Sequence, residues 1–299
     1  MRPKSRSTKI EGRAAAEQPP VSRPTKGLSR IEDLAPVKQP KDPRVLVIDI
    51  ESAPIEAFVW GLWDQNIGLD FIKTDWTILS YAAQWFGEKK MIYADTGGRG
   101  ADKVRDDYPL LGQLWELLNE ADLVVAQNGK RFDVRKINAR LIQHGYTPYS
   151  PIRVVDTMIE AKRYFAFTSQ KLAWTSKLLT DTPKSEHKQF PGFELWIECL
   201  KDNPKAWRVM RRYNCQDIRS TAKVYAKLRP WIKNHPNISA FDLRPGGACP
   251  NCGSKKVEHV GSATLQAGVY AQYRCLSCGA WPRGKQLLNS TEVRKSKLV

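Results

Sequence analysis

Two closely spaced cysteine pairs near the end of the chain constrain its folding more than any other feature. Cys249 and Cys252 form one C-x-x-C unit, and Cys275 and Cys278 form a second. Each pair is followed by glycine, which permits the tight turn that brings two thiolates to one ion. Four sulfur ligands complete a tetrahedral site, so we expect one structural Zn²⁺. Residues 245–284 contain few large apolar side chains, so the metal must supply the stability of this small unit.

The cysteine pattern resembles a zinc ribbon, and its position divides the rest of the chain. Residues 233–244 are interpreted as a polar linker before the ribbon and residues 285–299 as a basic tail. Residues 1–43 are rich in Lys, Arg and Pro and show no helical or strand periodicity, so we expect a disordered basic arm. Residues 44–232 remain for a larger domain with its own core.

The charge balance indicates the class of partner. The chain has 48 Lys and Arg against 31 Asp and Glu, a formal net charge of +17. Such a surplus favours binding to nucleic acid, although a basic surface without a specific partner has the same signature. No apolar run approaches the roughly 20 residues that span a bilayer, and the N-terminus has no apolar signal region. We therefore expect no membrane association and a cytoplasmic, non-secreted protein.

Alternating apolar strands and amphipathic helices predict the fold class of the larger domain. The pattern is α/β, with a mixed sheet flanked by helices. The expected strands are residues 44–50, 77–86, 90–94, 123–126 and 153–156, and the clearest helices are 108–119, 133–144 and 204–228. In the ribbon, short strands are expected at 257–259 and 270–274.

Two carboxylates end the first predicted strand. Asp49 and Glu51 are separated by one residue, so a strand places both side chains on the same face. Adjacent carboxylates repel each other unless a cation neutralises them, and oxygen ligands are those preferred by Mg²⁺ or Mn²⁺. A solvated strand end is the alternative explanation, and for this motif alone it is the more common one.

Two further motifs carry acids. Asn128, Phe132 and Asp133 follow the strand at 123–126, and Asp133 begins the next helix, where an acid often serves only as an N-cap. Tyr213 and Asp217 are four residues apart in the last long helix and therefore share one face. Taken alone, Asp217 is equally explained as an exposed acid paired with a neighbouring arginine.

Together, D-x-E, N-x-x-x-F-D and Y-x-x-x-D in this order resemble the DEDD superfamily of exonucleases, and the tyrosine resembles its DEDDy branch. The resemblance implies a ribonuclease-H-like fold and a two-metal-ion 3′→5′ exonuclease using Mg²⁺ or Mn²⁺. It implies that Asp49 bridges the two ions, that Glu51 and Asp217 complete one site, and that Asp133 helps to hold the other. Tyr213 would orient the attacking water.

The combination with a zinc ribbon is most similar to exonucleases predicted in bacteriophages, which implies a location in the host cytoplasm. The substrate implied is the 3′ end of nucleic acid, with DNA favoured, and a polymerase or other replication protein is a candidate partner. Ser52, Asn128, Lys130 and Arg131 are candidate substrate contacts. The alternatives are the same fold acting on RNA or branched structures, and a nucleic-acid-binding or assembly module whose nuclease site is idle.

Several conspicuous residues have simpler explanations. Trp60 and Trp63 are expected in the core, as most tryptophans of an α/β domain are, with base stacking as the alternative. Asp156 is expected to cap a helix. His187 is expected in a loop, with substrate contact as the less favoured explanation.

Overall fold

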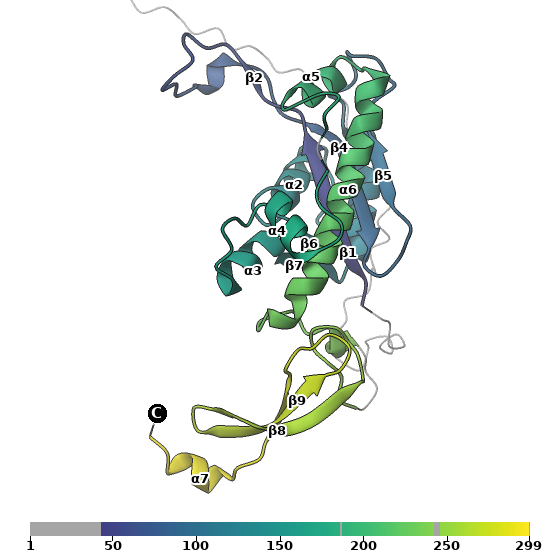
Figure 1. The fold of residues 1–299 in the computed structure, drawn as a ribbon. Helices are drawn as coiled ribbons and strands as arrows, with labels where there is room; N and C mark the ends of the chain where they lie inside the picture. Colours follow the sequence, from purple (N-terminus) through teal and green to yellow (C-terminus); the bar gives the residue numbers. More distant parts are fainter. Residues whose placement is uncertain (1–42, 186, 242–245, 299) are drawn as a thin grey trace, which may run out of the picture.

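A five-stranded mixed sheet forms the centre of the larger domain (Figure 1). The structure is a computed structural model that describes residues 43–185, 187–241 and 246–298. The disordered arm expected at residues 1–43 lies, except for its last residue, outside the described residues. The sheet order is β5-β4-β1-β6-β7. The strands are β1 (Val45–Ser52), β4 (Ile78–Trp85), β5 (Ile92–Asp95), β6 (Leu123–Ala126) and β7 (Arg153–Asp156).

Strand directions make the sheet mixed, as the sequence predicts. β1 pairs antiparallel with β4 and parallel with β6; β4 pairs antiparallel with β5, and β6 pairs parallel with β7. Antiparallel pairing therefore occupies one half of the sheet, and helical crossovers join the parallel strands in the other half.

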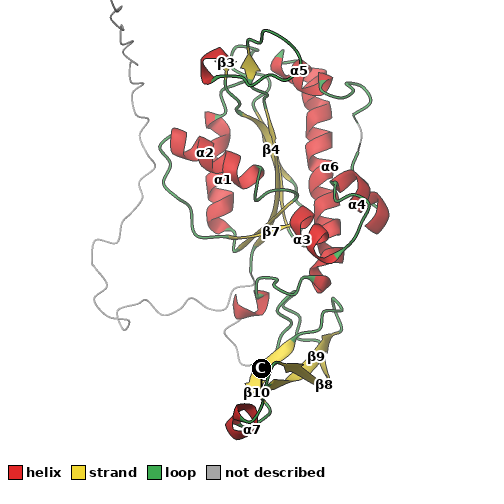
Figure 2. Cartoon of the chain, turned by 90° about the vertical axis from the view of Figure 1, so that its left-hand side faces the viewer, coloured by secondary structure: helices red, strands yellow, loops and turns green. Residues whose placement is uncertain are grey.

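Helices cover both faces of the sheet (Figure 2). α1 and α2 pack on one face, and α3, α4 and α6 pack on the other. A short α5 packs against α6. The bounds are α1 (Tyr108–Glu120), α2 (Asp133–Gln143), α3 (Thr157–Tyr164), α4 (Leu172–Leu179), α5 (Glu194–Leu200) and α6 (Pro204–Leu228).

Alternation along β1 decides which helices its side chains meet. Leu46, Ile48 and Ile50 join the core beneath α1 and α2, whereas Val45 and Val47 join the core beneath α6. Because successive side chains of a strand point to opposite faces, the odd-numbered acids at the end of β1 lie on the α6 side. This sets the position of the site described below.

The chain leaves the sheet between β1 and β4. It forms a two-stranded ribbon from β2 (Glu56–Ala57) and β3 (Ile72–Thr74), joined by a loop that includes the 3₁₀ helix η2 (Leu69–Phe71). Figure 1 shows this segment projecting from the end of the domain at which β1 ends. Residues 55–71 are called the aromatic loop below.

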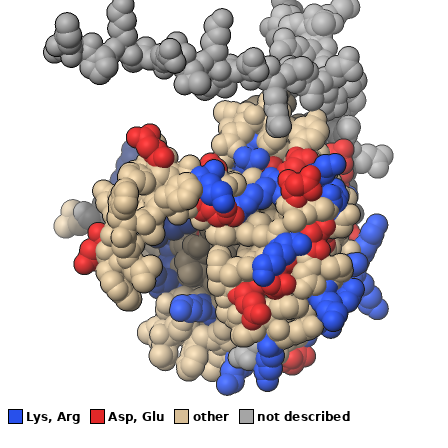
Figure 3. Space-filling view, turned by 90° about the horizontal axis from the view of Figure 1, so that it is seen from above, with Lys and Arg blue, Asp and Glu red and all other residues tan. Residues whose placement is uncertain are grey.

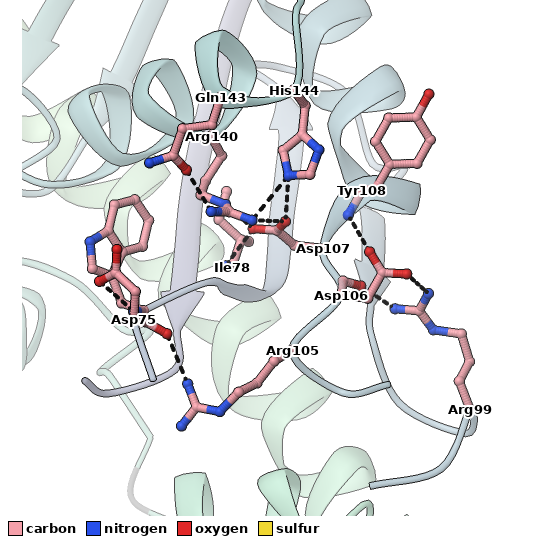
Figure 4. Close-up of polar contacts among 11 residues, drawn as sticks. Asp75, Ile78, Arg99, Arg105, Asp106, Asp107, Tyr108, Arg140, Gln143 and His144 are labelled. Carbon is pink, nitrogen blue, oxygen red and sulfur yellow. Dashed lines mark hydrogen bonds and ion pairs between the residues drawn. The ribbon is translucent and has the colours of Figure 1, made fainter. Parts of the chain in front are cut away.

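Polar contacts fix the base of the aromatic loop and the start of α1, and Figure 4 shows those of Arg105 with Asp75 and of Asp107 with Arg140. Arg105 pairs with Glu56 at 2.5 Å and donates to the backbone oxygen of Asp75 at 3.1 Å. The fully buried Asp107 accepts two hydrogen bonds of 2.7 Å from Arg140 of α2 and one of 2.9 Å from the backbone nitrogen of Ile78. A buried carboxylate needs such partners to remain charged.

The C-terminal unit is a three-stranded sheet, β8 (Val257–Leu265), β9 (Gly268–Cys275) and β10 (Arg283–Leu287), followed by α7 (Thr291–Lys295). β8 is much longer than the strand predicted at residues 257–259. Its register shifts between His259 and Gly261, where Gly261 has φ +131°. A bulge breaks the two-residue alternation, so the sequence pattern could not extend the strand beyond it.

The segment expected to be a linker packs against the larger domain. Ile238 of η4 (Ile238–Phe241) is buried with the residues beneath α6. The ribbon contacts the larger domain as well, because Asn251 donates to the backbone oxygens of Arg229 and Ile232, at 2.7 and 3.2 Å. Within the described part of the chain, no helix combines the length and apolarity that a membrane crossing requires.

Candidate active site

Asp49 and Glu51 lie where β1 faces α6. Asn214 of α6 donates to Oδ2 of Asp49 at 2.6 Å, and its own Oδ1 accepts from Ser80 of β4 at 3.2 Å. Asn214 is fully buried, so these contacts link the two strands to the helix without water. The carboxylate of Asp49 is therefore held in a defined orientation toward α6.

Asp217 reaches the same position from α6. Its side chain is buried, and the ammonium of Lys184 donates to Oδ2 at 2.5 Å. Oδ1 has no hydrogen-bond partner among the described residues. One carboxylate oxygen each from Asp49, Glu51 and Asp217 lie within 4.8 Å of one another. The alternative of an exposed acid paired with a neighbouring arginine is wrong for Asp217.

Asp133 lies beside this group and not within it. It is the first residue of α2, whose N-cap is Phe132, and its carboxylate accepts from the backbone nitrogen of Ile50 at 2.9 Å. That hydrogen bond crosses from α2 to β1, so Asp133 is more than a local helix cap. Burial is the largest cause of the raised pKa of Asp49, and the negative charge of Asp133 is the second largest. The two carboxyl groups are therefore close to each other.

Burial raises the pKa of all four carboxyl groups. The pKa of Glu51 rises to about 8, through loss of water and then through the charge of Asp217. The pKa of Asp133 rises to about 7 because of burial. The pKa of Asp49 shifts well upward for the same reason, and burial also raises the pKa of Asp217 although Lys184 opposes it. Repelling buried acids with an orphaned oxygen suit a hard divalent cation, whose charge would favour their ionised forms.

Tyr213 and Lys184 border the acids. Burial raises the pKa of Tyr213 to about 12, with Asp217 adding to the shift, so the phenol is protonated at neutral pH. Burial lowers the pKa of Lys184, but Asp217 and Tyr213 raise it more, so its ammonium is charged. Its Nζ lies 4.5 Å from the centre of the Tyr213 ring. The ring of His187 meets that of Tyr213 edge-on, with centroids 5.0 Å apart.

The four candidate substrate contacts lie at two places near the acids. Ser52 ends β1, where its pairing with Ile78 follows an irregularity in register. Asn128 has φ +64° in the loop between β6 and α2, a conformation that asparagine tolerates better than most residues. Lys130 and Arg131 in the same loop are exposed.

The carboxylate of Asp156 binds the backbone of the loop between β6 and α2. Its carboxylate accepts from the backbone nitrogens of Asn128 and Lys130 at 3.0 and 3.1 Å. The same carboxylate caps α3 by accepting from Met158 and Ile159. The predicted helix cap is confirmed, and Asp156 additionally positions the second acidic motif.

Three residues of the site were not predicted from the sequence: Lys184, Asn214 and Trp196, whose side chain lowers the pKa of Glu51 against the effect of burial. Asn214 lies inside the Y-x-x-x-D motif, three residues before Asp217. Residues three apart on a helix lie on the same side, so the sequence could have placed Asn214 beside Asp217. Lys184 follows Pro183 in a loop, and its pairing with Asp217 depends on tertiary structure that no local pattern reveals.

Two cavities beside the site carry positive charge. One of about 480 Å³ is lined by Tyr213 together with Lys177, Lys184 and Lys188. A second, of about 630 Å³, is lined by Arg211, Arg212 and Arg219 of α6 together with Lys188 and His187. Neither has an acidic residue among its described lining residues. Such cavities match a polyanionic ligand.

The four cysteines form a second candidate metal centre. Their Sγ atoms lie within 4.8 Å of one another, with 3.7 Å between Cys249 and Cys278 and 3.6 Å between Cys252 and Cys275. A tetrahedron with Zn–S bonds of about 2.3 Å has S···S separations of about 3.8 Å. The glycines after the pairs have φ +75° and +83°, as the tight turns require. The donor set therefore fits one zinc ion.

Comparison with known proteins gave a family match and a structural similarity. A family model of the RNase H superfamily matches residues 98–229, which run from before α1 to just past the end of α6. Comparison with curated proteins gave no significant match. Among solved structures, the chain is similar to the family B DNA polymerase from the hyperthermophilic archaeon Pyrobaculum calidifontis, with 18% sequence identity and a TM-score of 0.45. That alignment covers 67% of this chain and 26% of the polymerase, so the chain spans about a quarter of its length. The mixed sheet and its covering helices form an RNase H-like fold, and the family match over residues 98–229 is consistent with it.

Proposed function

We propose that this chain is a divalent-metal-dependent nuclease that removes nucleotides from the 3′ end of a DNA strand. The observation that carries the proposal is the convergence of Asp49, Glu51 and Asp217, from β1 and α6, to within 4.8 Å. The RNase H-like fold supports a nuclease. The finer statement, a DEDDy exonuclease, is supported by the presence of Asp133 and Tyr213 beside the same acids.

Asp49, Glu51 and Asp217 would hold one ion, with Asp49 also contacting a second ion held by Asp133. In such sites the ions activate water and stabilise the leaving oxygen of the phosphodiester. Asn214 fixes the orientation of Asp49, and the hydrogen bond from Ile50 fixes that of Asp133. The carboxylates would therefore be arranged before substrate arrives, which is the condition for electrostatic catalysis.

Tyr213 and Lys184 act on the reacting groups by hydrogen bonding and charge. With a pKa of about 12, the phenol of Tyr213 cannot serve as a base at neutral pH. It would donate to, and thereby orient, the attacking water or the phosphate. The charged Lys184 lies between Asp217 and the ring of Tyr213, where an ammonium can also stabilise negative charge on the phosphate.

The four cysteines would hold a structural zinc ion, and the basic C-terminal unit would contact the phosphate backbone. From residue 233 onward the chain has ten Lys and Arg against three acids. Four sulfur ligands leave no open position, so the ion would contribute to folding and not to hydrolysis. A replication protein such as a polymerase remains the proposed protein partner.

The test uses purified protein and linear single strands of DNA and of RNA, labelled at either end. With Mg²⁺ or Mn²⁺, 5′-labelled DNA should shorten as a ladder, while 3′-labelled DNA should release labelled mononucleotide at once. EDTA should stop both reactions. Faster hydrolysis of RNA than of DNA would identify RNA as the substrate. Cleavage of a circular strand would indicate an endonuclease. The absence of hydrolysis under every condition would indicate a nucleic-acid-binding module without nuclease activity.

A further inference from the structure

The aromatic loop exposes an unusual amount of apolar surface. Nine large apolar side chains between residues 55 and 71 are exposed, among them Phe58 at 68%, Trp60 at 91% and Trp63 at 83%. The expectation that Trp60 and Trp63 belong to the core is therefore wrong. Single exposed apolar residues are common, but a contiguous group of this size marks a binding surface.

The base of the loop is braced, although its aromatic side chains are open to solvent. Arg105 ties Glu56 of β2 to the backbone oxygens of Pro54 and Asp75. The backbone nitrogen of Phe58 donates to the oxygen of Phe71 at 2.9 Å. The aromatic surface is thus presented from a fixed support, which lowers the entropy lost when a ligand binds.

The loop begins next to the acids. Ile55 follows Glu51 by only four residues, so the aromatic surface starts at the strand end that carries Asp49 and Glu51. Trp196 of α5 is close enough to Glu51 to lower its pKa, and it stacks on the exposed Phe193, with ring centroids 6.2 Å apart. Aromatic rings therefore flank the candidate active site from both β1 and α5.

Charge is divided between the loop and the body. Residues 55–71 contain no Lys or Arg and three acids, Glu56, Asp64 and Asp70. Figure 3, viewed from the end where the loop projects, shows a hollow between this mostly uncharged lobe and the body, with Lys and Arg side chains on its walls. A ligand in that hollow would meet apolar rings on one side and positive charge on the other.

We propose that the aromatic loop stacks on the bases of a single strand that leads into the active site, while the Lys and Arg side chains of the hollow contact its phosphates. A single strand is the polymer that presents flat apolar rings along one edge and negative charges along the other. Stacking of this kind tolerates any sequence, because every base has a π-face. The inference rests on the proposed function and extends it by adding a subsite for the strand upstream of the cleaved nucleotide.

The test compares binding of two probes by the zinc-loaded full chain in buffer that contains neither Mg²⁺ nor Mn²⁺, where no hydrolysis occurs. One probe is a fluorescein-labelled 20-mer of thymidine, and the other is an abasic 20-mer with the same phosphates. The wild type should prefer the thymidine probe. The double variant W60A/W63A should bind it at least about 10-fold more weakly, since one stacked base is worth roughly 5- to 150-fold, and should bind the abasic probe as before.

Matched variants separate stacking from other causes. W60F/W63F should restore the preference for the thymidine probe, whereas W60L/W63L, apolar but not aromatic, should not. W231A removes another exposed tryptophan, outside the loop, and should change nothing. Circular dichroism establishes that each variant is folded.

A small substrate tests the nuclease proposal separately from the stacking proposal. Hydrolysis of the p-nitrophenyl ester of thymidine 5′-monophosphate, too short to reach the loop, should be the same in the wild type and in W60A/W63A. If the wild type fails to hydrolyse this ester and any strand, the nuclease proposal fails while the binding test still decides the subsite. Equal affinity of wild type and W60A/W63A for the thymidine probe would overturn the stacking proposal and leave the loop as a surface for a protein.

Discussion

The ammonium of Lys184 lies 2.5 Å from Oδ2 of Asp217, while Oδ1 of the same carboxylate has no partner among the described residues. One oxygen is thus paired with a protein cation, and the same carboxylate belongs to the group formed with Asp49 and Glu51. Lys184 lowers the pKa of Asp217 against the larger effect of burial, so it favours the ionised form of this carboxylate. Lys184 is therefore expected to act on metal binding as well as on substrate.

Replacing Lys184 by methionine should slow hydrolysis by about 10²-fold or more, the usual effect of removing one preorganised donor. It should also move the acidic limb of the kcat/KM–pH profile to higher pH, because the pKa of Asp217 rises when the neighbouring charge is removed. Lys184→Arg should preserve the profile. The control is Lys223→Met, which removes an ammonium that makes an equally short pair with Asp181 on the surface. An unshifted profile in Lys184→Met would show that the lysine has no effect on Asp217.

Each of Asp49→Ala, Asp133→Ala and Asp217→Ala should abolish hydrolysis, since each removes part of one metal-binding unit. The losses should not add when two substitutions are combined, as expected for residues that act together. Steady-state rates of single and double variants with Mg²⁺ measure this. Folding should survive in Asp49→Ala and Asp217→Ala, because removing one of several repelling acids relieves repulsion. Full activity of Asp49→Ala would remove the two-metal mechanism.

Stability of the protein free of Mg²⁺ and Mn²⁺ should fall as the pH rises from about 4 to about 8. The pKa values of Glu51 and Asp133 in the folded protein, about 8 and about 7, exceed the unfolded value of about 4. Such groups stabilise the folded state most below the unfolded pKa, and this contribution is lost as the pH rises through the folded values. Thermal unfolding with zinc retained and with no Mg²⁺ or Mn²⁺ present should show the decline, and Glu51→Gln should reduce it. Mn²⁺ should raise the midpoint most at high pH, and a Mn²⁺ effect independent of pH would contradict this.

Cys252→Ser should abolish zinc binding and weaken substrate binding more than it slows hydrolysis. The substituted unit loses the ion on which its folding depends, and with it a basic surface. We expect a raised KM, near-normal kcat at saturating DNA, and a shallower dependence of binding on salt, by roughly one counterion for each phosphate that the unfolded unit no longer binds.

Ser277→Ala is the control for this variant. Ser277 lies between Cys275 and Cys278, and its hydroxyl group forms a hydrogen bond with that of Ser254. Point substitution is preferable to truncation at residue 232, since Ile238 and Asn251 pack on the larger domain. Unchanged affinity and salt dependence in Cys252→Ser would instead make the ribbon a surface for another protein. Lost turnover at saturation would show that the two units are not independent.

Local sequence patterns predicted the strands of the sheet and the face on which the acidic side chains lie. They did not predict contacts between residues that are distant in the sequence. The two-residue period placed Asp49 and Glu51 on one face of β1, and helical spacing placed Tyr213 and Asp217 on one face of α6, so their convergence needed only the correct packing of helix on sheet. Lys184 lies 33 residues before Asp217 and belongs to no periodic element, so sequence offered no reason to join them.

The exposure of Trp60 and Trp63 could not be predicted from the sequence either. Tryptophans are usually buried, and nothing in their local spacing distinguishes a core position from a projecting loop. The outcome depends on the chain leaving the sheet after Pro54 and returning through β3. The bulge at Gly261 had a similar effect on the length of β8, because one extra residue reverses the alternation on which strand prediction depends.

The most direct test of the proposed metal centre is a calorimetric titration of Mn²⁺ into the zinc-loaded chain and its Asp49→Ala, Asp217→Ala and Asp181→Ala variants. Thiolate sites select zinc over manganese, so the ribbon should not contribute to the signal. We expect the wild type and Asp181→Ala to bind Mn²⁺ equally, because Asp181 is exposed and paired with Lys223 outside the site. Asp49→Ala and Asp217→Ala should lose this binding. Wild-type affinity in both would contradict the assignment of these carboxylates as the metal centre.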